Sequence, residues 1–224
     1  MLSDVMEDYL KTIYRLQRDG GGRVSTSELA EQLDVSPPTV TSMLAKLGER
    51  GLVEYEKYAG VELTDEGETV ALEVLRHHRL LEAYLAEHLD YDWSEVHDEA
   101  DALEHHISEE FEQRIAAALD DPEVDPHGDP IPGADLEPIE SGGATRLSEH
   151  DPGDVVVVER VRDRDREELQ YLAEAGITPE TRLEVVDVAP FGMVTVAHDR
   201  GEQSLPAEVA ASIHVRVAEA TGTA

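Results

Sequence analysis

The ten residues HDEADALEHH, at 97–106, concentrate side chains of the kind that bind metal ions. They include three histidines and four carboxylates, in a chain that contains no cysteine. On a helix His97, Asp101 and His105 recur every four residues, and Glu104 falls beside them, so four potential ligands share one face. Imidazole and carboxylate groups together suit a borderline-to-hard divalent ion such as Mn2+, Fe2+, Co2+ or Zn2+.

Two other segments offer ligands of the same type. His78 and Glu82 lie one helical turn apart in the preceding apolar helical segment, and Asp8 lies in the N-terminal one. The sequence therefore predicts that separate helices converge on one divalent ion. We expect the remaining histidines to be incidental; they are His77, His88, His106, His127, His150, His198 and His214.

Apolar periodicity predicts an α+β fold that is mainly α, with helices before a Pro- and Gly-rich segment and short β-branched strands after it. The expected domains are a winged helix-turn-helix at 1–73, a helical metal-binding and dimerisation domain at 74–121, a linker at 122–145, and a small antiparallel β-barrel at 146–224, for which a family resemblance implies an SH3-like (FeoA-like) fold. The stripe Ala100, Leu103, Ile107 and Phe111 is expected to pack against a second copy of the chain.

The winged helix-turn-helix is the part expected to read DNA. Ser25 and Glu28 form a capping-box pattern, and Ser36-Pro37 is a helix start that follows a tight turn. Two short strands are expected on either side of Ala59-Gly60, with Thr64 capping the next helix. In this fold the second helix enters the DNA major groove. The predicted DNA contacts are small, polar or basic residues: Arg23, Ser36, Pro38, Thr39, Thr41, Ser42, Lys46 and Lys57.

The charge balance is extreme, with 18 Lys and Arg against 51 Asp and Glu, a net charge of −33. Molar salt screens such repulsion, so the composition is typical of a halophilic protein from a salt-accumulating cytoplasm. It also predicts DNA binding that salt inhibits less than usual, because few cations release counterions. We expect no membrane contact, since no leader-like or membrane-spanning apolar run is present.

The chain resembles the diphtheria-toxin-repressor (DtxR/MntR) family, dimeric transcription factors that bind DNA when loaded with Fe2+ or Mn2+. The resemblance rests on MEDYLKTIY, SPPTVTSMLAKL, HHRLLEAYL and HDEADALEHHIS. It implies a double-stranded operator as partner, a homodimer, and no small-molecule substrate. It also implies a primary metal site of Asp8, Asp101, Glu104 and His105, and an adjacent site of His78, Glu82 and His97. His78 serves the primary site in some members.

Further expectations come from the same resemblance. The C-terminal domain can lend oxygen ligands to the adjacent site, and DRDREELQ offers Asp165 and Glu168. Iron-type members carry Met and Cys where this chain has Asp8 and Asp101, so the oxygen ligands favour Mn2+, with Fe2+ as the alternative. Manganese-type members often carry Glu where Lys11 stands, which argues against a two-manganese cluster.

The expected function is a metal-dependent DNA-binding repressor of metal-uptake genes that is not an enzyme. A metalloenzyme is the first alternative, weakened because no HExxH motif occurs. A winged-helix regulator that ignores metal is the second. Because metal ligands must be deprotonated, binding is expected to weaken below about pH 6.

Overall fold

The computed structural model describes residues 2–139, 143–163, 165–190 and 192–218. They form two compact units, both of which contain parts of the central helices. The first unit comprises Met1–His78, Asp101–Arg114 and Ile131–Ser141, and the second comprises Arg79–Ala100, Ile115–Pro130 and Gly142–Ala224. The domain boundaries expected from the sequence stay a prediction.

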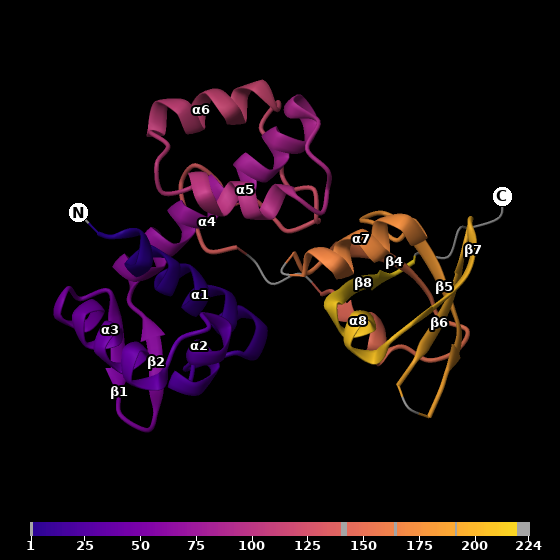
Figure 1. Ribbon diagram of the computed structural model, residues 1–224, viewed down its shortest axis with the longest axis horizontal. Coiled ribbons are helices and arrows are strands. Elements are labelled where there is room, and N and C mark those ends of the chain that lie inside the picture. Colours follow the sequence, from indigo (N-terminus) through magenta and orange to yellow (C-terminus); the bar gives the residue numbers. More distant parts are fainter. Residues whose placement is uncertain (1, 140–142, 164, 191, 219–224) are drawn as a thin grey trace. The chain divides into compact units, whose positions relative to one another are not determined.

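The first unit begins with a winged helix-turn-helix (Figure 1). Its elements are α1 (Asp4–Gly20), α2 (Thr26–Gln32), α3 (Pro37–Glu49), β1 (Val53–Glu56), β2 (Gly60–Leu63) and the first part of α4 (Asp65–Leu89). The apolar faces of α1, α3 and α4 share one core, in which Leu10, Leu44 and Leu72 are fully buried or nearly so. Helix α1 packs on α2 and β2, and α3 packs on α2 and β1, so α1 and α3 are joined through this core.

Local sequence explains where these helices begin and end. The Ser25 hydroxyl accepts from the Glu28 amide at 3.2 Å and the Glu28 carboxylate accepts from the Ser25 amide at 2.8 Å, which confirms the predicted capping box. Thr64 caps α4 by accepting from the Gly67 amide. Ser36 occupies the N-cap of α3 as expected, but its hydroxyl pairs with the Thr39 hydroxyl instead of capping an amide.

The expected single helix from His97 to Phe111 is interrupted, which corrects the prediction of a continuous apolar stripe. Helix α5 (Val96–Leu103) ends in a turn, and α6 (Glu109–Ala118) begins after Ser108, whose hydroxyl accepts from the Phe111 amide. Ala100 is fully buried within the chain, so it is not available to a second copy. Phe111 remains 46% exposed.

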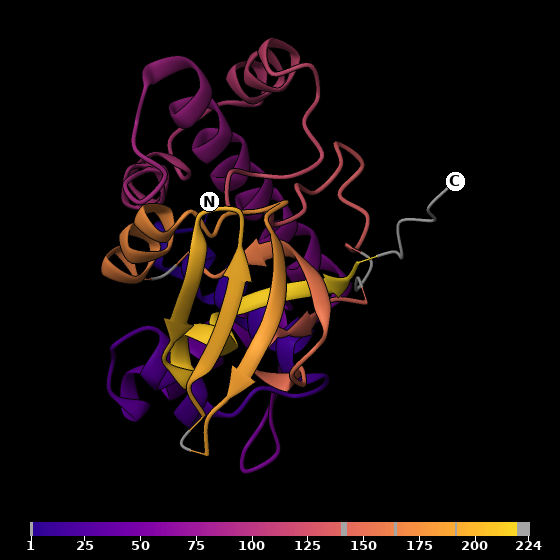
Figure 2. The same ribbon diagram turned by 90° about the vertical axis from the view of Figure 1, so that its right-hand side faces the viewer.

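The second unit contains a six-stranded antiparallel sheet in the order β3-β8-β4-β5-β6-β7, whose broad face is seen in Figure 2. The strands are β3 (Thr145–Arg146), β4 (Val155–Val161), β5 (Arg182–Val188), β6 (Val194–His198), β7 (Gly201–Leu205) and β8 (Ile213–Val217). Four of them match the β-branched runs of the sequence. The polar strand β7 and the helices α7 (Arg166–Ala175) and α8 (Ala207–Ser212) lack that signal and were not predicted.

The segment expected to be a linker is partly a buried loop of the second unit. Asp125, His127 and Asp129 are each less than a tenth exposed. The Val161 amide donates to the His127 carbonyl, and Gly128, at φ +88°, lies so close to the Glu159 carbonyl that a Cβ would meet it at 2.0 Å. Among the described helices, none is long and apolar enough to cross a membrane.

Gly67 provides a test of how α4 packs on the wing. A Cβ at this helical position would lie 1.9 Å from the Leu52 carbonyl oxygen. We expect Gly67→Ala to lower the free energy of unfolding by about 1–3 kcal/mol through overpacking. In Gly48→Ala, whose Cβ would meet its nearest atom at 3.8 Å, the free energy of unfolding should rise by up to about 1 kcal/mol. Urea unfolding followed by circular dichroism measures the free energy of unfolding of both variants. Equal changes in the two would contradict the close approach of Gly67 to the Leu52 carbonyl.

Candidate metal centre

The first unit brings together ligand-type side chains from three separate segments, here called the Glu104 cluster. Helix α1 supplies Glu7 and Asp8, α4 supplies His78, and the end of α5 with the turn after it supplies Asp101, Glu104 and His105. In the groups Asp8–Glu104–His105 and His78–Asp101–Glu104, the ligand atoms lie within 4.8 Å of one another. These are the residues that the resemblance implied for the primary site, with His78 joining them.

Glu104 is common to both groups, and its side chain is fully buried. Its Oε2 lies 2.6 Å from His78 Nδ1, and its Oε1 lies 3.2 Å from His105 Nε2. Burial raises the pKa of the carboxyl, but His78 and Lys11 together outweigh that effect and lower the pKa below its usual value. Glu104 is therefore held as a carboxylate, the form that binds a cation.

His105 is oriented by a carboxylate that was not among the ligands expected from the sequence. Its Nδ1 lies 2.7 Å from Glu7 Oε2, so Nδ1–H donates to Glu7 and Nε2 faces Asp8 at 3.0 Å. This is the arrangement in which a second carboxylate fixes the tautomer of a metal-binding histidine. Burial lowers the pKa of His105, but Glu7, Glu104 and Asp8 outweigh it and raise the pKa. Burial also raises the pKa of Asp8.

A lysine of α1, Lys11, contacts the Glu104 cluster. It is 6% exposed, and its Nζ donates to Asp101 Oδ1 at 2.9 Å and to Glu104 Oε1 at 2.6 Å. The sequence placed Lys11 on the ligand helix without showing what it contacts. In the fold, its ammonium pairs with two of the candidate ligands.

A second cluster lies in the second unit and is here called the Glu82 cluster. Glu82 of α4 is fully buried, and its Oε1 lies 3.1 Å from His97 Nδ1. The same His97 nitrogen lies 3.3 Å from Asp163 Oδ2. Glu82 and His97 were expected together, whereas Asp163, which follows β4, was not predicted. Two carboxylates thus face one imidazole nitrogen.

The C-terminal ligands expected from the resemblance, Asp165 and Glu168, lie outside the groups of converging ligand atoms among the described residues. Asp165 is the N-cap of α7 and accepts from the amides of Glu167 and Glu168. The Glu168 carboxylate accepts from the Ser212 hydroxyl. Asp163, two residues before Asp165, is the carboxylate of this segment that lies beside His97.

The Glu82 cluster also includes Asp125 and His127, which were expected in a linker and, for His127, among the incidental histidines. Their ligand atoms and those of Glu82 lie within 4.8 Å of one another. His127 Nε2 donates to the Trp93 carbonyl at 2.9 Å, which leaves Nδ1 as a lone-pair atom with no hydrogen bond among the described residues. Asp125 Oδ2 likewise has no hydrogen bond there. These buried donor atoms fit a cation.

Arg79 offsets part of the negative charge around Asp125. Burial, then Glu82 and Asp129, raises the pKa of Asp125 well above its usual value, against the opposing effect of Arg79. Arg79 Nε lies 3.6 Å from Asp125 Oδ2, and Asp129 Oδ1 accepts from both Arg79 and Arg160. A divalent cation beside Asp125 would favour its charged form, as the buried arginine does in part.

The predicted DNA contacts all lie on the exposed surface of the first unit, around α2, α3 and the wing formed by β1 and β2. They are Arg23, Ser36, Pro38, Thr39, Thr41, Ser42, Lys46 and Lys57. Arg23 is already paired with carboxylates of the wing, including Glu56 at 3.4 Å and Glu62. Lys46 lies in the last turn of α3, and Lys57 lies at the wing tip with its Nζ 5.0 Å from the centre of the Tyr58 ring.

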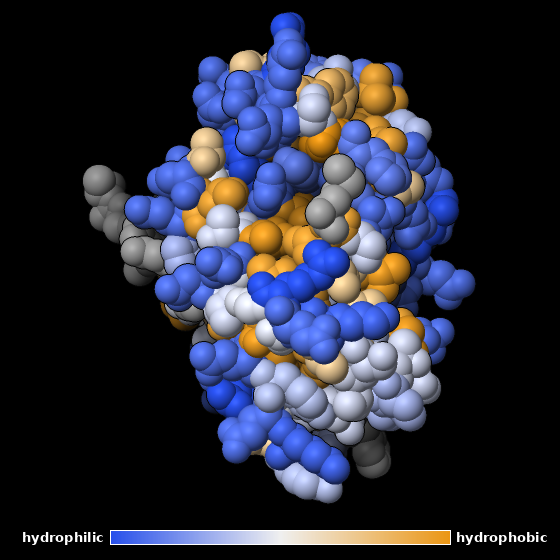
Figure 3. Space-filling model, turned by 90° about the vertical axis from the view of Figure 1, so that its left-hand side faces the viewer, coloured by the Kyte–Doolittle hydropathy of each residue, from blue (hydrophilic) through white to orange (hydrophobic). Residues whose placement is uncertain are grey.

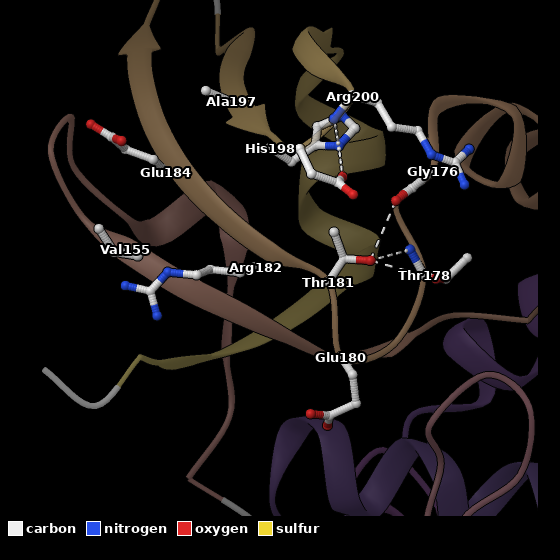
Figure 4. Close-up of a pocket in the computed structure, with 11 residues that line it drawn as sticks. Val155, Gly176, Thr178, Glu180, Thr181, Arg182, Glu184, Ala197, His198 and Arg200 are labelled. Atoms are coloured by element: carbon white, nitrogen blue, oxygen red, sulfur yellow. Dashed lines mark hydrogen bonds and ion pairs between the residues drawn. The ribbon is translucent and has the colours of Figure 1, made fainter. Parts of the chain in front are cut away.

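A separate hollow of about 700 Å³ lies on the C-terminal domain (Figure 4). It is lined by both charge signs, including Glu184, Arg182 and Arg200. Thr181 Oγ1 donates to the Gly176 carbonyl at 3.3 Å and accepts from the Thr178 amide at 3.1 Å. Among the described residues, none of the groups of converging ligand atoms lies in this hollow.

Comparison with known proteins identifies the architecture. Residues 1–61 match the model of the iron dependent repressor N-terminal DNA binding domain, 64–133 its metal binding and dimerisation domain, and 145–217 the FeoA domain. The chain belongs to the iron-dependent repressor family. It is a metal-dependent, DNA-binding transcriptional repressor with the winged-helix, helical and SH3-like parts that the sequence predicted, which confirms both the fold class and the resemblance.

Relatives and solved structures cover almost the whole repressor. The iron-dependent repressor IdeR of Mycobacterium tuberculosis is 34% identical over 96% of this chain and 97% of its own length. The diphtheria toxin repressor of Corynebacterium diphtheriae is 31% identical over 96% and 97%. A manganese-dependent transcriptional repressor in complex with manganese is 41% identical with a TM-score of 0.89, covering 95% of this chain and 100% of that one. The manganese regulator SloR is 34% identical with a TM-score of 0.79, covering 95% and 98%.

The raised pKa of His105 gives a pH prediction for the Glu104 cluster. A histidine whose pKa is raised by folding stabilises the metal-free fold fully below its usual value of 6.5, and this contribution is lost as pH rises through the raised value. Metal binding needs the neutral ring, so affinity should fall as pH decreases through the same interval, above the pH 6 expected from the sequence.

Calorimetric titration with Mn2+ in buffers of different ionisation enthalpy measures the protons released on binding. Just below the raised pKa, wild type should release more protons than His105→Asn, which has no proton to lose at that position. Equal proton release by the two proteins would show that His105 does not compete with metal for a proton.

Proposed function

We propose that this repressor is loaded by Mn2+ and that the loaded form binds the operators of metal-uptake genes. The donor chemistry of the Glu104 cluster carries the proposal. Asp8 and Asp101 contribute carboxylates and the chain has no cysteine, so the donors are oxygen and imidazole nitrogen. Such a set suits the harder Mn2+, and Fe2+ is the alternative. The 41% identical structural neighbour is a manganese-dependent repressor, which supports the same choice.

Two metal positions are proposed for each chain. The first uses Asp8, His78, Asp101, Glu104 and His105 of the Glu104 cluster, with Glu7 orienting His105. The second uses the Glu82 cluster, in which Glu82, His97 and Asp163 are joined by Asp125 and His127. Asp163 takes the role that was expected of Asp165 and Glu168.

The bound ion supplies positive charge that holds separate segments together. In the first unit, Asp8 and Glu7 lie on α1, while Glu104 and His105 lie in the turn after α5. Carboxylates that would otherwise repel one another can close together only when a cation balances them. Because α1 and α3 share one core, closing this cluster restrains the helix that reads DNA. Ion binding can shift the repressor toward the DNA-binding form only by the difference in its affinity for the two forms.

The DNA surface is proposed to work through shape and side-chain hydroxyls as well as charge. Ser36, Pro38, Thr39, Thr41 and Ser42 are exposed at the start of α3, where the two prolines leave hydroxyls as the hydrogen-bonding groups. Arg23, Lys46 and Lys57 supply the positive charge for phosphate contacts. Since Arg23 is neutralised by wing glutamates, we propose that salt reduces operator binding less than is usual.

A homodimer is proposed through apolar surface of the first unit. Figure 3 shows apolar side chains gathered on one face among hydrophilic ones. The exposed large apolar residues of this unit include Val5 on α1 and Phe111 on α6. We propose that Phe111 lies in the dimer contact, in place of the continuous stripe expected from the sequence, and that the dimer acts on DNA in the cytoplasm. The residues of both metal clusters are proposed to act in regulation, without an enzymatic role.

Operator binding titrated with Mn2+ and with Fe2+ under anaerobic conditions tests this function. DNA that co-purifies with the Mn2+-loaded repressor from genomic fragments supplies the operator. We expect Mn2+ to activate binding at lower free concentration than Fe2+, and His105→Ala to abolish activation. His106→Ala is the matched control, because His106 is exposed and outside both clusters. Equal binding with chelator and with metal would overturn the proposal and favour a metal-independent regulator.

The assignment of Asp163 is tested by a pair of neighbouring variants. Asp163→Asn should reduce the number of Mn2+ ions retained per chain and weaken the second binding step at least tenfold, because a charged ligand is lost. Asp165→Asn keeps a good helix N-cap and should bind as wild type. Calorimetry with metal analysis after gel filtration compares them. A stronger loss in Asp165→Asn would return the ligand role to Asp165.

A further inference from the structure

We infer that Lys11 is a built-in cation of the Glu104 cluster, occupying the position that a second divalent ion would take, so that this cluster binds one ion instead of two. The inference rests on the proposed function, since it concerns how many ions the same residues accept. The resemblance indicated only that Lys11 stands where manganese-type members often carry Glu; the contacts of its Nζ assign it a role in setting metal stoichiometry.

The geometry of Glu104 provides two cation positions. Its Oε1 faces the group that contains Asp8 and His105. Its Oε2 lies 2.6 Å from His78 Nδ1, in the group that also contains Asp101. A carboxylate with one oxygen toward each of two ligand groups is the usual bridge between paired metal ions. The fold thus offers a two-ion frame around one buried carboxylate.

Lys11 contacts one member of each ligand group. Its Nζ lies 2.6 Å from Glu104 Oε1 and 2.9 Å from Asp101 Oδ1. Both are charge-assisted hydrogen bonds, and the lysine side chain is only 8% exposed. An ammonium held between two candidate ligands competes directly with a divalent ion for their oxygens.

The charge count shows what Lys11 changes. Glu7, Asp8, Asp101 and Glu104 bring four negative charges, and Lys11 reduces them to three. One divalent ion then leaves the cluster at −1 and a second leaves it at +1, whereas without Lys11 the four carboxylates balance two divalent ions. Lys11 therefore removes the neutral two-ion state, which matters because buried charge is costly unless it is balanced. The preference for one ion rests on the Glu104 and Asp101 oxygens that Nζ already contacts.

The experiment compares wild type with Lys11→Arg, Lys11→Met and Lys11→Glu in the full-length chain. Retained Mn2+ per chain is counted by metal analysis after gel filtration. An ion in the Glu82 cluster contributes equally to wild type and variants, so the difference between their counts reports the Glu104 cluster. We expect Lys11→Arg to retain the wild-type number. Lys11→Met and Lys11→Glu should each retain one additional Mn2+ per chain. Circular dichroism establishes that each variant is folded, and Lys11→Glu supplies the test if Lys11→Met is not.

Electron paramagnetic resonance of the same samples reports whether the added ion is beside the first. Two Mn2+ ions that share Glu104 are magnetically coupled, so the variants should show a broadened signal that wild type lacks. An unchanged ion count in both neutral and acidic variants, or a coupled pair already present in wild type, would overturn the inference. If instead wild type binds no Mn2+ that His105→Ala removes, the proposed function itself fails.

Discussion

The structure of the first unit depends on keeping the carboxylate of Glu104 charged although its side chain is fully buried. A buried charge is costly unless it is paired and hydrogen-bonded. Here His78, His105 and Lys11 surround it, and they reach it from α4, the turn after α5, and α1. The requirement that one anion be balanced thus draws three separate segments together. A divalent ion bound as proposed would add to the same balance of charge.

The Glu82 cluster also contains buried carboxylates, but their charge is offset by different partners. Glu82, Asp125 and Asp163 crowd one region, and Arg79 offsets part of their charge. His127 is aimed by the Trp93 carbonyl, so that its unprotonated nitrogen faces Glu82. In the Glu104 cluster a lysine already pairs with two of the candidate ligands. In the Glu82 cluster the buried Asp125 Oδ2 and His127 Nδ1 lack a hydrogen bond among the described residues. The charges of the Glu104 cluster are therefore better paired within the chain, and a cation would stabilise the Glu82 cluster more.

The acidic composition affects the DNA surface and the metal clusters in opposite ways. Around the clusters, extra carboxylates increase attraction for a divalent ion, and Glu7 additionally orients a ligand. On the wing, Glu54, Glu56 and Glu62 pair with Arg23 and reduce the charge available to DNA phosphates. Recognition of DNA by such a surface, as proposed, depends on the fit of α3 and its exposed hydroxyls.

The sequence by itself determined the winged helix-turn-helix, and it predicted most of the residues that gather in the two clusters. Capping residues such as Ser25 and Thr64, and the spacing of His78 from Glu82, are local features that a short stretch of chain encodes. It also indicated four of the barrel strands through their β-branched runs. It predicted neither the break between α5 and α6 nor the polar strand β7, because their local signals were weak.

Only the tertiary structure showed which side chains contact one another. Helical periodicity placed His97 with Asp101 and His105, whereas the resemblance grouped His97 with Glu82 and His105 with Asp8. In the fold His97 lies beside Glu82 and Asp163, and His105 lies beside Asp8 and Glu7. The fold also placed His127 inside a cluster instead of a linker, and the Lys11 ammonium between Asp101 and Glu104. Such contacts join residues far apart in the chain, and side-chain type and spacing carry no information about a partner that only packing brings near.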